Sequence, residues 1–492
     1  MEQQIWVQDH AVPPPKVAKA ESRALVIDLE GALLRSNLDQ EALFADAAGS
    51  LACLYDAVVS GSGKGGFLDR VLTEAEIDYA HLPYEPEVLN IALAARARGR
   101  KIYIAARRYP HHAAAIASHL GFDGVVALAE LAAATQTSDT AAPGPGFDAG
   151  NFDYIGNGRA PESVWRAAFT TYVVGGSDQL SKQLELLNPS LKQIGGRDFS
   201  WRTWLNALRV HQYAKNTLVF VPALTSHQMN LASLGEALLA FLAFSACASS
   251  GYLLNDLFDL AADRQHPNKR YRAIASGALP IPMALIAIPV LWIASAVAGL
   301  FISSVFVAVL GAYLAITIAY SLYLKKKMLV DIVTLAGLYT VRIVGGAVAI
   351  GVYISEWLMI FSLFIFTSLA LIKRYSELAM RQEAGLANPA NRDYRISDLQ
   401  IVAAMAAASG MNAITVFSLY VSSYVSSPTV AQMYGRPWML WLLNPLLLYW
   451  IGRALMLAHR QAMPDDPIVY TFKDNASRIV VVAMMCIVLA AI

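Results

Sequence analysis

The sequence is poor in charged residues and in cysteine, and it has no excess charge of either sign. Only 15% of its 492 residues are charged, whereas soluble chains usually carry about 25%. The net charge of +1 gives no support to a nucleic-acid partner. Cys53, Cys247 and Cys486 stand far apart without metal-ligand spacing, so neither a disulfide framework nor a zinc site is expected. Residues 1–19 are polar and lack the apolar core of a signal peptide, so we expect the N-terminal part to stay in the cytoplasm.

The charge deficit is confined to one part of the chain. Residues up to about Arg202 have the composition of a soluble domain, whereas long apolar runs alternate with short polar ones from about Leu205 onward. We therefore expect a tail at 1–20, a soluble domain at 21–200 and a membrane domain at 201–492. Alternating strand-like and helix-like segments predict an α/β, Rossmann-like layered fold for the soluble domain.

Nine apolar runs are long enough to be membrane helices, for which about 20 apolar residues are needed. The membrane domain is therefore expected to be all-α. The runs cover approximately 205–225, 234–254, 281–300, 301–322, 332–352, 357–372, 401–424, 438–457 and 478–492.

Lysine and arginine gather in every second loop between these runs, after the second, fourth, sixth and eighth. The alternate loops carry almost none, with Arg436 as the exception. By the positive-inside rule, the N-terminal domain lies in the cytoplasm and the C-terminus lies outside the plasma membrane. For Lys325, Lys326 and Lys327, a role in topology alone and a role in function both stay open.

An acidic segment directly follows the second apolar run. Asp256, Asp259 and Asp263 are spaced three and four residues apart, so on one helix their carboxylates share a face. Such carboxylates repel one another unless a cation lies among them, and Mg²⁺ prefers oxygen ligands and bridges substrate phosphates. Ionisable residues at a membrane edge are functional candidates. Asn255 precedes the acids and three cations follow them, Lys269, Arg270 and Arg272. The segment predicts a metal–phosphate clamp.

The string YLLNDLFDLAADRQHPNKRYRAIASGALP resembles the first Asp-rich motif of the UbiA prenyltransferase superfamily, and more narrowly its decaprenyl-phosphate phosphoribosyltransferase branch. The strings LRVHQYAKNTLVFVPAL, YSLYLKKKMLVDIVTLAGLYTVRIVGGAVA and IKRYSEL resemble further parts of that branch. The resemblance implies an enzyme among membrane lipids. Such an enzyme transfers 5-phosphoribosyl from phosphoribosyl pyrophosphate to a polyprenyl phosphate, requires Mg²⁺ and releases pyrophosphate. Association with further copies of the chain stays open.

The resemblance also implies roles for single residues. Asp256 and Asp259, assisted by Asn255 and Asp263, would hold Mg²⁺ on the pyrophosphate. The cations at 269, 270 and 272 would bind the pyrophosphate or the lipid phosphate. Further substrate-binding candidates are Lys373 and Arg374, for the ribose 5-phosphate, and Lys215, Asn216 and Arg342, without assigned roles.

Arg342 stands inside a predicted membrane run. A lone arginine there is costly, so we expect it to meet an anion or an acid such as Asp331. A purely structural ion pair is an equally open interpretation.

Two other functions stay open for the membrane domain. Members of the superfamily that prenylate aromatic rings with a polyprenyl diphosphate carry a second Asp-rich motif, which here reads KRYSE. Cations thus stand where carboxylates are expected, although Asp393 and Asp398 farther along keep that alternative open. A lipid carrier with vestigial sites is the other alternative, and the intact acidic cluster counts against it.

In the soluble domain, ALVIDLEGALL and YIGNGRAPESVW resemble the first and fourth motifs of the haloacid dehalogenase superfamily, with Asp28 as the nucleophile. Glu30 replaces the second Asp, and Ala105 or Ala106 replaces the usual Ser or Thr. No lysine lies between Lys101 and Lys182, and Asn157 and Pro161 replace the acids of the fourth motif. We therefore expect a degenerate domain with a structural or regulatory role. The alternative is a phosphatase that acts on the phosphoribosyl lipid, with Lys182 and Glu162 as substitutes.

Overall fold

The computed structural model describes residues 23–47, 77–135, 147, 150–196, 200–389, 392–425, 434–463, 470–471 and 473–492, and the predicted tail 1–20 lies outside them. The described residues form two compact units. The first is drawn from Met1–Trp204 and Asp256–Ala284, and the second from Leu205–Asn255 and Leu285–Ile492. The acidic segment therefore belongs to the same unit as the N-terminal domain. The domain limits 21–200 and 201–492 stay predictions.

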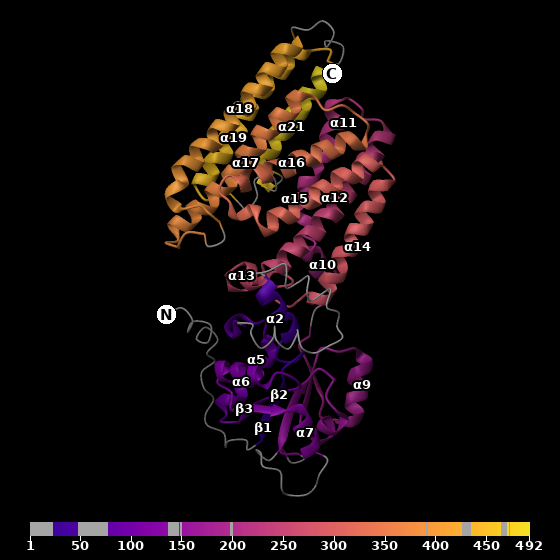
Figure 1. Ribbon diagram of the computed structural model, residues 1–492, viewed down its shortest axis with the longest axis vertical. Helices are drawn as coiled ribbons and strands as arrows, with labels where there is room; N and C mark the ends of the chain where they lie inside the picture. Colours follow the sequence, from indigo (N-terminus) through magenta and orange to yellow (C-terminus); the bar gives the residue numbers. More distant parts are fainter. Residues whose placement is uncertain are drawn as a thin grey trace. The chain divides into compact units, whose positions relative to one another are not determined.

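The first unit is built on a parallel sheet with the strand order β3-β2-β1-β4-β5-β6 (Figure 1). Its strands are β1 (Ala24–Asp28), β2 (Ile102–Ala106), β3 (Gly124–Ala127), β4 (Phe152–Gly156), β5 (Thr171–Val174) and β6 (Lys192–Ile194). β1 is almost wholly apolar because a central parallel strand is covered on both faces. The carboxyl end of β1 lies where the strand order reverses, which is where ligands bind in open α/β sheets.

Helices cover both faces of this sheet. Successive side chains of β1 point to opposite faces, so Leu25 and Ile27 enter one core and Val26 the other. The first core takes in α5 (Pro86–Ala97) and α6 (Pro110–Leu120), and the second takes in α7 (Leu128–Ala134), α8 (Glu162–Ala167) and α9 (Asp178–Leu187). This confirms the predicted α/β layers; the haloacid dehalogenase resemblance stays a prediction.

Among the described residues, four further helical elements belong to the first unit. They are α2 (Leu38–Ala47), η2 (Tyr79–His81), α13 (Leu260–Gln265) and η4 (Lys269–Tyr271).

In the part of the chain that the structure describes, the second unit is built of helices. Its long helices are α12 (Leu231–Phe258), which continues into the first unit, α14 (Ile281–Leu300), which begins there, α15 (Ser304–Leu322), α16 (Val330–Ala349), α17 (Glu356–Glu383), α18 (Leu399–Val425) and α19 (Leu443–His459). Within the described residues, these seven are long and apolar enough to cross a membrane, where α19 is counted together with the 3₁₀ segment directly before it, Pro437–His459, 23 residues in all. Short 3₁₀ segments lie between them, namely η5 (Leu324–Lys326), η6 (Ile396–Asp398) and η7 (Pro437–Leu442).

The predicted count of nine spans is not confirmed. The first run is divided into α10 (Trp201–Ala207), the 3₁₀ segment η3 (Val210–Phe220) and α11 (Val221–Thr225). Arg209 breaks it with a φ of 53°, a left-handed conformation that ends an α-helix. The last run forms α21 (Asn475–Ala491), whose 17 residues reach about 26 Å, short of a bilayer core of about 30 Å. The predicted orientation of the termini stays a prediction.

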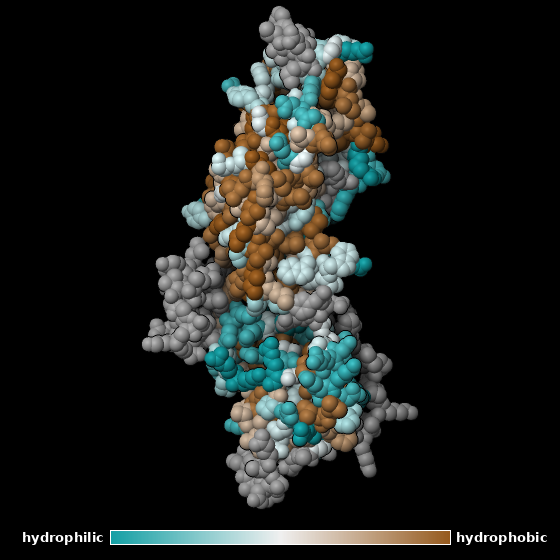
Figure 2. Space-filling model, turned by 90° about the vertical axis from the view of Figure 1, so that its right-hand side faces the viewer, coloured by the Kyte–Doolittle hydropathy of each residue, from teal (hydrophilic) through white to brown (hydrophobic). Residues whose placement is uncertain are grey.

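The surface and the interior of the second unit differ as they do in membrane proteins. Figure 2 shows apolar side chains, in brown, over much of its visible face. On α14, exposed apolar residues recur along the helix, at Leu285, Ile286, Val290, Ile293 and Val297. Its interior holds polar side chains that bond to other protein groups, such as Asn216 to Ser245 and Ser368 to the carbonyl of Ala406.

Candidate functional site

The acidic segment does not lie on one helix. α12 ends at Phe258, Asp259 is the N-cap of α13, and Asp263 lies on α13. The φ and ψ of Asp259, −92° and 10°, lie in the bridge region rather than in the helical region. The prediction that all three carboxylates share one face of a single helix is therefore wrong, because one helix ends before Asp259 and the next begins after it.

Two of the three acids nevertheless converge on one cation. Nη1 of Arg272 donates to Oδ1 of Asp256 at 3.1 Å and to Oδ2 of Asp263 at 2.6 Å. Both carboxylates are buried, whereas the Arg272 side chain is 27% exposed. Burial raises the pKa of Asp263, the positive charge of Arg272 lowers it, and the negative charge of Asp256 raises it further. Burial and the charge of Asp256 thus disfavour the ionised form of Asp263, and the charge of Arg272 opposes them.

These residues fit Mg²⁺ in donor chemistry. Arg272 places a positive charge between two buried carboxylates, and carboxylate oxygens are the ligands that Mg²⁺ prefers. Across the described part of the chain, no three His, Cys, Asp or Glu side chains are grouped as a ready metal site. Asp256 and Asp263 are therefore the residues that would hold a metal, with the half-buried Asp259 next along the chain.

The predicted pyrophosphate cations differ in their surroundings. Lys269 is exposed on η4, and Arg270 donates to the hydroxyl of Tyr271 at 2.9 Å and stacks on its ring. Arg272 hydrogen-bonds to the acids, and Lys269 lies close enough for its positive charge to lower the pKa of Asp263.

The end of α17 contains a buried ion-pair network in the second unit. Nη2 of Arg374 donates to Oδ2 of Asp331 at 2.7 Å, and Nη1 donates to Glu377. Asp331 also accepts from Tyr394 at 2.7 Å and from Arg392 at 3.4 Å. Arg374 and Asp331 are 1% and 0% exposed. The charge of Arg374 is therefore balanced by protein acids, and these contacts give no support to its predicted direct role on a phosphate.

Arg342 lies elsewhere and has different partners. Its guanidinium donates to Oδ1 of Asn216 at 2.7 Å, to the Tyr313 hydroxyl at 2.8 Å and to the carbonyl of Leu338. The expectation that Arg342 meets Asp331 is wrong, since Asp331 is the second residue of α16 and Arg342 is eleven residues along, about 16 Å away. Within the described residues Arg342 forms no ion pair, although it is 4% exposed. A buried cation with neutral partners is suited to an anionic ligand.

Lys215 lies on η3 beside this cluster. It is 8% exposed, donates to Gln212 at 3.1 Å, and its ammonium lies 5.9 Å from the ring centre of Tyr339. The Arg342 guanidinium lies 5.7 Å from the same ring centre. The structure thus brings together three of the predicted substrate-binding residues, Lys215, Asn216 and Arg342.

Sequence reasoning left Lys325, Lys326 and Lys327 without a decision between topology and function. Nζ of Lys325 lies 3.5 Å from Oδ1 of Asn255, the residue that precedes Asp256. The motif YSLYLKKK carried this signal, but three consecutive lysines do not show which one turns toward the helices.

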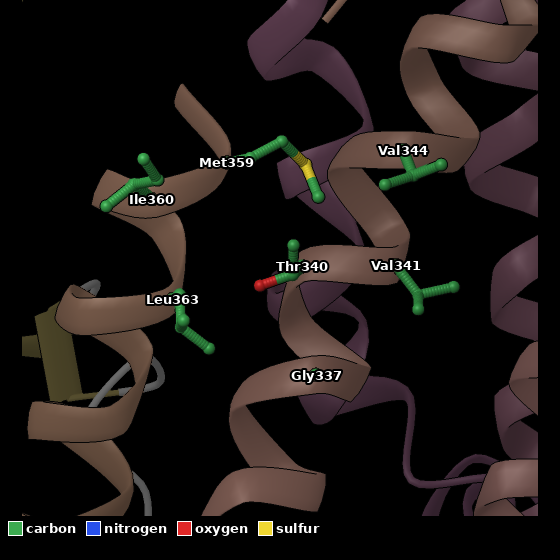
Figure 3. A pocket seen from close by; sticks show the side chains of 7 residues that line it. All are labelled: Gly337, Thr340, Val341, Val344, Met359, Ile360 and Leu363. Atoms are coloured by element: carbon green, nitrogen blue, oxygen red, sulfur yellow. The ribbon is translucent and has the colours of Figure 1, made fainter. Parts of the chain in front are cut away.

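An apolar groove lies between α16 and α17 (Figure 3). It has a volume of about 330 Å³. Met359 and Leu363 reach from α17 toward α16. Thr340, the one polar side chain among its seven lining residues, has its hydroxyl bonded to the carbonyl of Ala336. The groove suits a hydrocarbon chain.

In the first unit, Asp28 lies at the carboxyl end of β1 with its carboxylate 1% exposed. Oδ2 accepts from Tyr154 at 3.4 Å and lies 3.6 Å from Nη2 of Arg107. Burial raises the pKa of Asp28 to about 6, although the positive charge of Arg107 opposes that rise. Burial and the charge of Asp39 likewise raise the pKa of Glu30. The carboxylates are therefore held in surroundings that favour their protonated forms.

Arg107 was missed because the sequence was searched for lysine. It comes directly after β2, and Asp28 pairs with Ala105 across the two strands, so this placement could have been read from the strand ends. Of the proposed substitutes, Glu162 pairs with Arg166 at the surface and Lys182 is exposed on α9. The site has a counter-charge for an anion that its sequence motifs did not predict.

Residues 218–476 match the sequence profile of the UbiA prenyltransferase family. The chain belongs to that family. It is thus an enzyme of a family of membrane prenyltransferases, which confirms the resemblance found in the acidic motif.

Two curated proteins and a solved structure are similar to this UbiA protein. "Uncharacterized protein y4nM" of Sinorhizobium fredii is 31% identical over 458 residues, which are 92% of this chain and 88% of that protein. That similarity necessarily includes both units. "Decaprenyl-phosphate phosphoribosyltransferase" of Mycobacterium tuberculosis is 32% identical over 188 residues, 37% of this chain and 62% of that enzyme. A UbiA homolog from Archaeoglobus fulgidus bound to GPP and Mg²⁺ covers 58% of this chain and 99% of its own, with 14% identity and a TM-score of 0.45.

Proposed function

We propose that the protein transfers the 5-phosphoribosyl group of phosphoribosyl pyrophosphate to a polyprenyl phosphate and releases pyrophosphate. The observation that carries the proposal is the pair of buried carboxylates, Asp256 and Asp263, that share one cationic partner. They lie in a chain similar to a decaprenyl-phosphate phosphoribosyltransferase over 188 residues. A diphosphate group chelated by a metal is the ligand that such an acidic pair accepts.

The acids would hold the leaving-group end of the donor substrate. Asp256 and Asp263 would be the metal ligands, with Asp259 and Asn255 assisting. Mg²⁺, when bound, would neutralise the charge that builds up on pyrophosphate. Arg272 already lies between the two acids, so it would move onto a phosphate oxygen when the site is filled. Lys269 and Arg270 follow it in the same segment and would add positive charge.

The reaction needs positioning more than acid–base chemistry. The bond from the ribose C1 to the pyrophosphate oxygen breaks, and a bond from C1 to an oxygen of the lipid phosphate forms. That oxygen is already anionic, so no general base is required. Catalysis then depends on alignment and on cations aimed at the phosphates.

The second unit contains further candidates for binding phosphate groups. Arg342 is buried among neutral partners, with Lys215 and Asn216 beside it, and this cluster would bind one phosphate group. Lys373 stays our candidate for the ribose 5-phosphate. Arg374 would position the end of α17 through Asp331 and would not touch the substrate.

The lipid partner accounts for the apolar groove between α16 and α17. Its lining is almost entirely apolar, so an isoprenoid chain could lie along it among the membrane lipids. The lipid phosphate would remain outside the groove, which offers it no cation.

Aromatic prenylation is less well supported. At the place of the second Asp-rich motif, Glu377 is bound by Arg374. Of the two acids that kept this alternative open, Asp398 accepts the backbone N–H of Arg395 as a cap of η6, and Asp393 is exposed. These contacts do not resemble a second buried acidic pair.

The direct test uses the purified full-length protein in detergent. It is supplied with radiolabelled phosphoribosyl pyrophosphate and decaprenyl phosphate, in Mg²⁺ or in EDTA. We expect a labelled lipid and free pyrophosphate only with Mg²⁺. A parallel reaction holds a polyprenyl diphosphate and an aromatic acid. Product in that reaction and none in the first would reject the proposal in favour of aromatic prenylation.

For the soluble domain we propose a structural role. One observation favours phosphatase activity instead, namely the guanidinium of Arg107 beside Asp28. It would replace the missing lysine, but Asn157 and Pro161 still stand where acids are expected, and the amide of Asn157 donates to the backbone of Glu30. Mass spectrometry of the lipid product distinguishes the two roles, because a phosphatase would leave a ribosyl lipid without its 5-phosphate.

A further inference from the structure

The helix that carries Asp263 is joined to the N-terminal α/β domain within the first unit. Arg264, the next residue on α13, forms a two-pronged ion pair with Glu41 of α2. Nη2 donates to Oε1 at 2.8 Å, and Nη1 donates to Oε2. The side chains are 7% and 4% exposed. A bidentate pair fixes both the distance and the rotation of the two groups, which a single contact does not.

Further contacts attach the same segment to the same domain. Nε2 of Gln265 donates to Oδ2 of Asp78 at 3.1 Å. Gly277 has a φ of 71° and lies so close to the domain that a Cβ there would come within 2.6 Å of Cβ of Arg35 and 3.3 Å of Cβ of Pro83.

The Arg264 side chain also stabilises the turn that follows α13. Its Nε donates to the carbonyl of Ala275 at 3.0 Å, so one guanidinium holds α2, α13 and the segment at 275 together. Arg272, which binds both acids, lies between these attachment points in the sequence. The α/β domain therefore restrains the backbone directly after Asp263 and on both sides of Arg272.

We propose that Glu41 is a positioning residue for the acidic site, and that the α/β domain serves as the support that holds α13 in place. This inference rests on the proposed function, since it concerns the same acids. Residues that orient metal ligands without touching the metal typically change metal affinity by about 10- to 100-fold when they are altered. Asp28 takes no part in this role, so a domain that has lost phosphatase residues would still be needed.

The test replaces Glu41 by Gln, which keeps the size of the side chain and removes its charge. The matched control is Asp153→Asn, which breaks another buried ion pair of the same domain. In that pair Nη2 of Arg100 lies 2.6 Å from Oδ2 of Asp153, on strand β4. The charge-exchanged double variant, Glu41→Arg with Arg264→Glu, restores the pair in reverse. Arg264→Lys, which keeps the charge but not the two-pronged geometry, takes the place of Glu41→Gln if that variant is not recovered as folded protein.

Two measurements on the full-length protein in detergent do not depend on turnover. Amide hydrogen exchange is followed in peptides that cover residues 256–272, and Mn²⁺ affinity is measured by electron paramagnetic resonance. For Glu41→Gln we expect exchange at 260–265 to rise roughly tenfold and Mn²⁺ affinity to fall roughly tenfold. Asp153→Asn should change neither by more than about twofold, and the exchanged pair should recover most of the loss.

Unchanged exchange and Mn²⁺ affinity in Glu41→Gln would overturn the inference, as would equal losses in Asp153→Asn. A wild-type protein that binds Mn²⁺ with the expected sensitivity to Glu41 but transfers no phosphoribosyl group would instead reject the proposed reaction and leave the positioning role in place.

Discussion

Replacing Asp256 by Asn should nearly abolish transfer while the protein stays folded. In the structure Arg272 bonds to Asp256 at 3.1 Å and to Asp263 at 2.6 Å. The variant keeps the stronger of these bonds, so we expect the folded state to lose only about 1–2 kcal/mol. Its site for a metal-bound pyrophosphate loses one of two buried negative charges.

The effect on catalysis should be larger than the effect on folding. Removing one group that stabilises charge in a transition state typically costs about 10²- to 10³-fold in rate, or about 2.7–4 kcal/mol. We therefore expect transfer by Asp256→Asn to fall by at least about 10²-fold, with a higher Mg²⁺ requirement. Asp259→Asn tests the assisting ligand in the same way, and we expect a comparable fall in transfer.

The assay follows initial rates of labelled lipid formation across a range of Mg²⁺ concentrations, with thermal unfolding measured on the same samples. Asp393→Asn is the matched control, since it removes an exposed acid from the loop between α17 and α18. It should leave transfer within about twofold of the wild type, as surface substitutions usually do. Near-normal turnover by Asp256→Asn at low Mg²⁺ would refute the assignment of the acidic pair.

Three further outcomes are expected. A reporter fused after Ile492 should behave as extracytoplasmic, and a reporter fused at Met1 should behave as cytoplasmic. If both reporters were found on one side of the membrane, the number of spans would be even and the predicted orientation would be wrong. Asp28→Asn should leave transfer unchanged, and neither form should release phosphate from the lipid; a ribosyl lipid made only by the wild type would show a working phosphatase. Because burial raises the pKa of Asp28 from 3.8 to about 6, its ionisation destabilises the folded domain as pH rises through that interval, by up to about 3 kcal/mol. Asp28→Asn should therefore raise the unfolding midpoint more at pH 7.5 than at pH 4.5, and an equal gain at both would contradict this.

Much of the architecture could be predicted from local patterns. A strand such as β1 can be recognised in the sequence as a short apolar run, because both of its faces are buried. The alternation of strand-like and helix-like segments around it indicated α/β layers with Asp28 at a strand end. Long apolar runs likewise indicated the membrane helices, and seven are confirmed by length and composition among the described residues. The apolar run at 205–225 was predicted to be one membrane helix, but hydropathy does not detect a break in the helical backbone such as the one at Arg209.

The candidate site was predicted in composition but not in pairing. The sequence by itself determined which residue types gather after the second membrane helix, because that pattern is written in consecutive positions. Only the tertiary structure decided that Asp256 and Asp263 share Arg272, that Asp331 neutralises Arg374 and not Arg342, and that Arg107 faces Asp28. The ion pair of Glu41 with Arg264 could not be predicted from the sequence either, since 223 residues separate the two in the chain. The reason is physical: apolar periodicity acts within one element, whereas a buried charge is stabilised by whichever opposite charge the packing of distant elements brings within bonding distance.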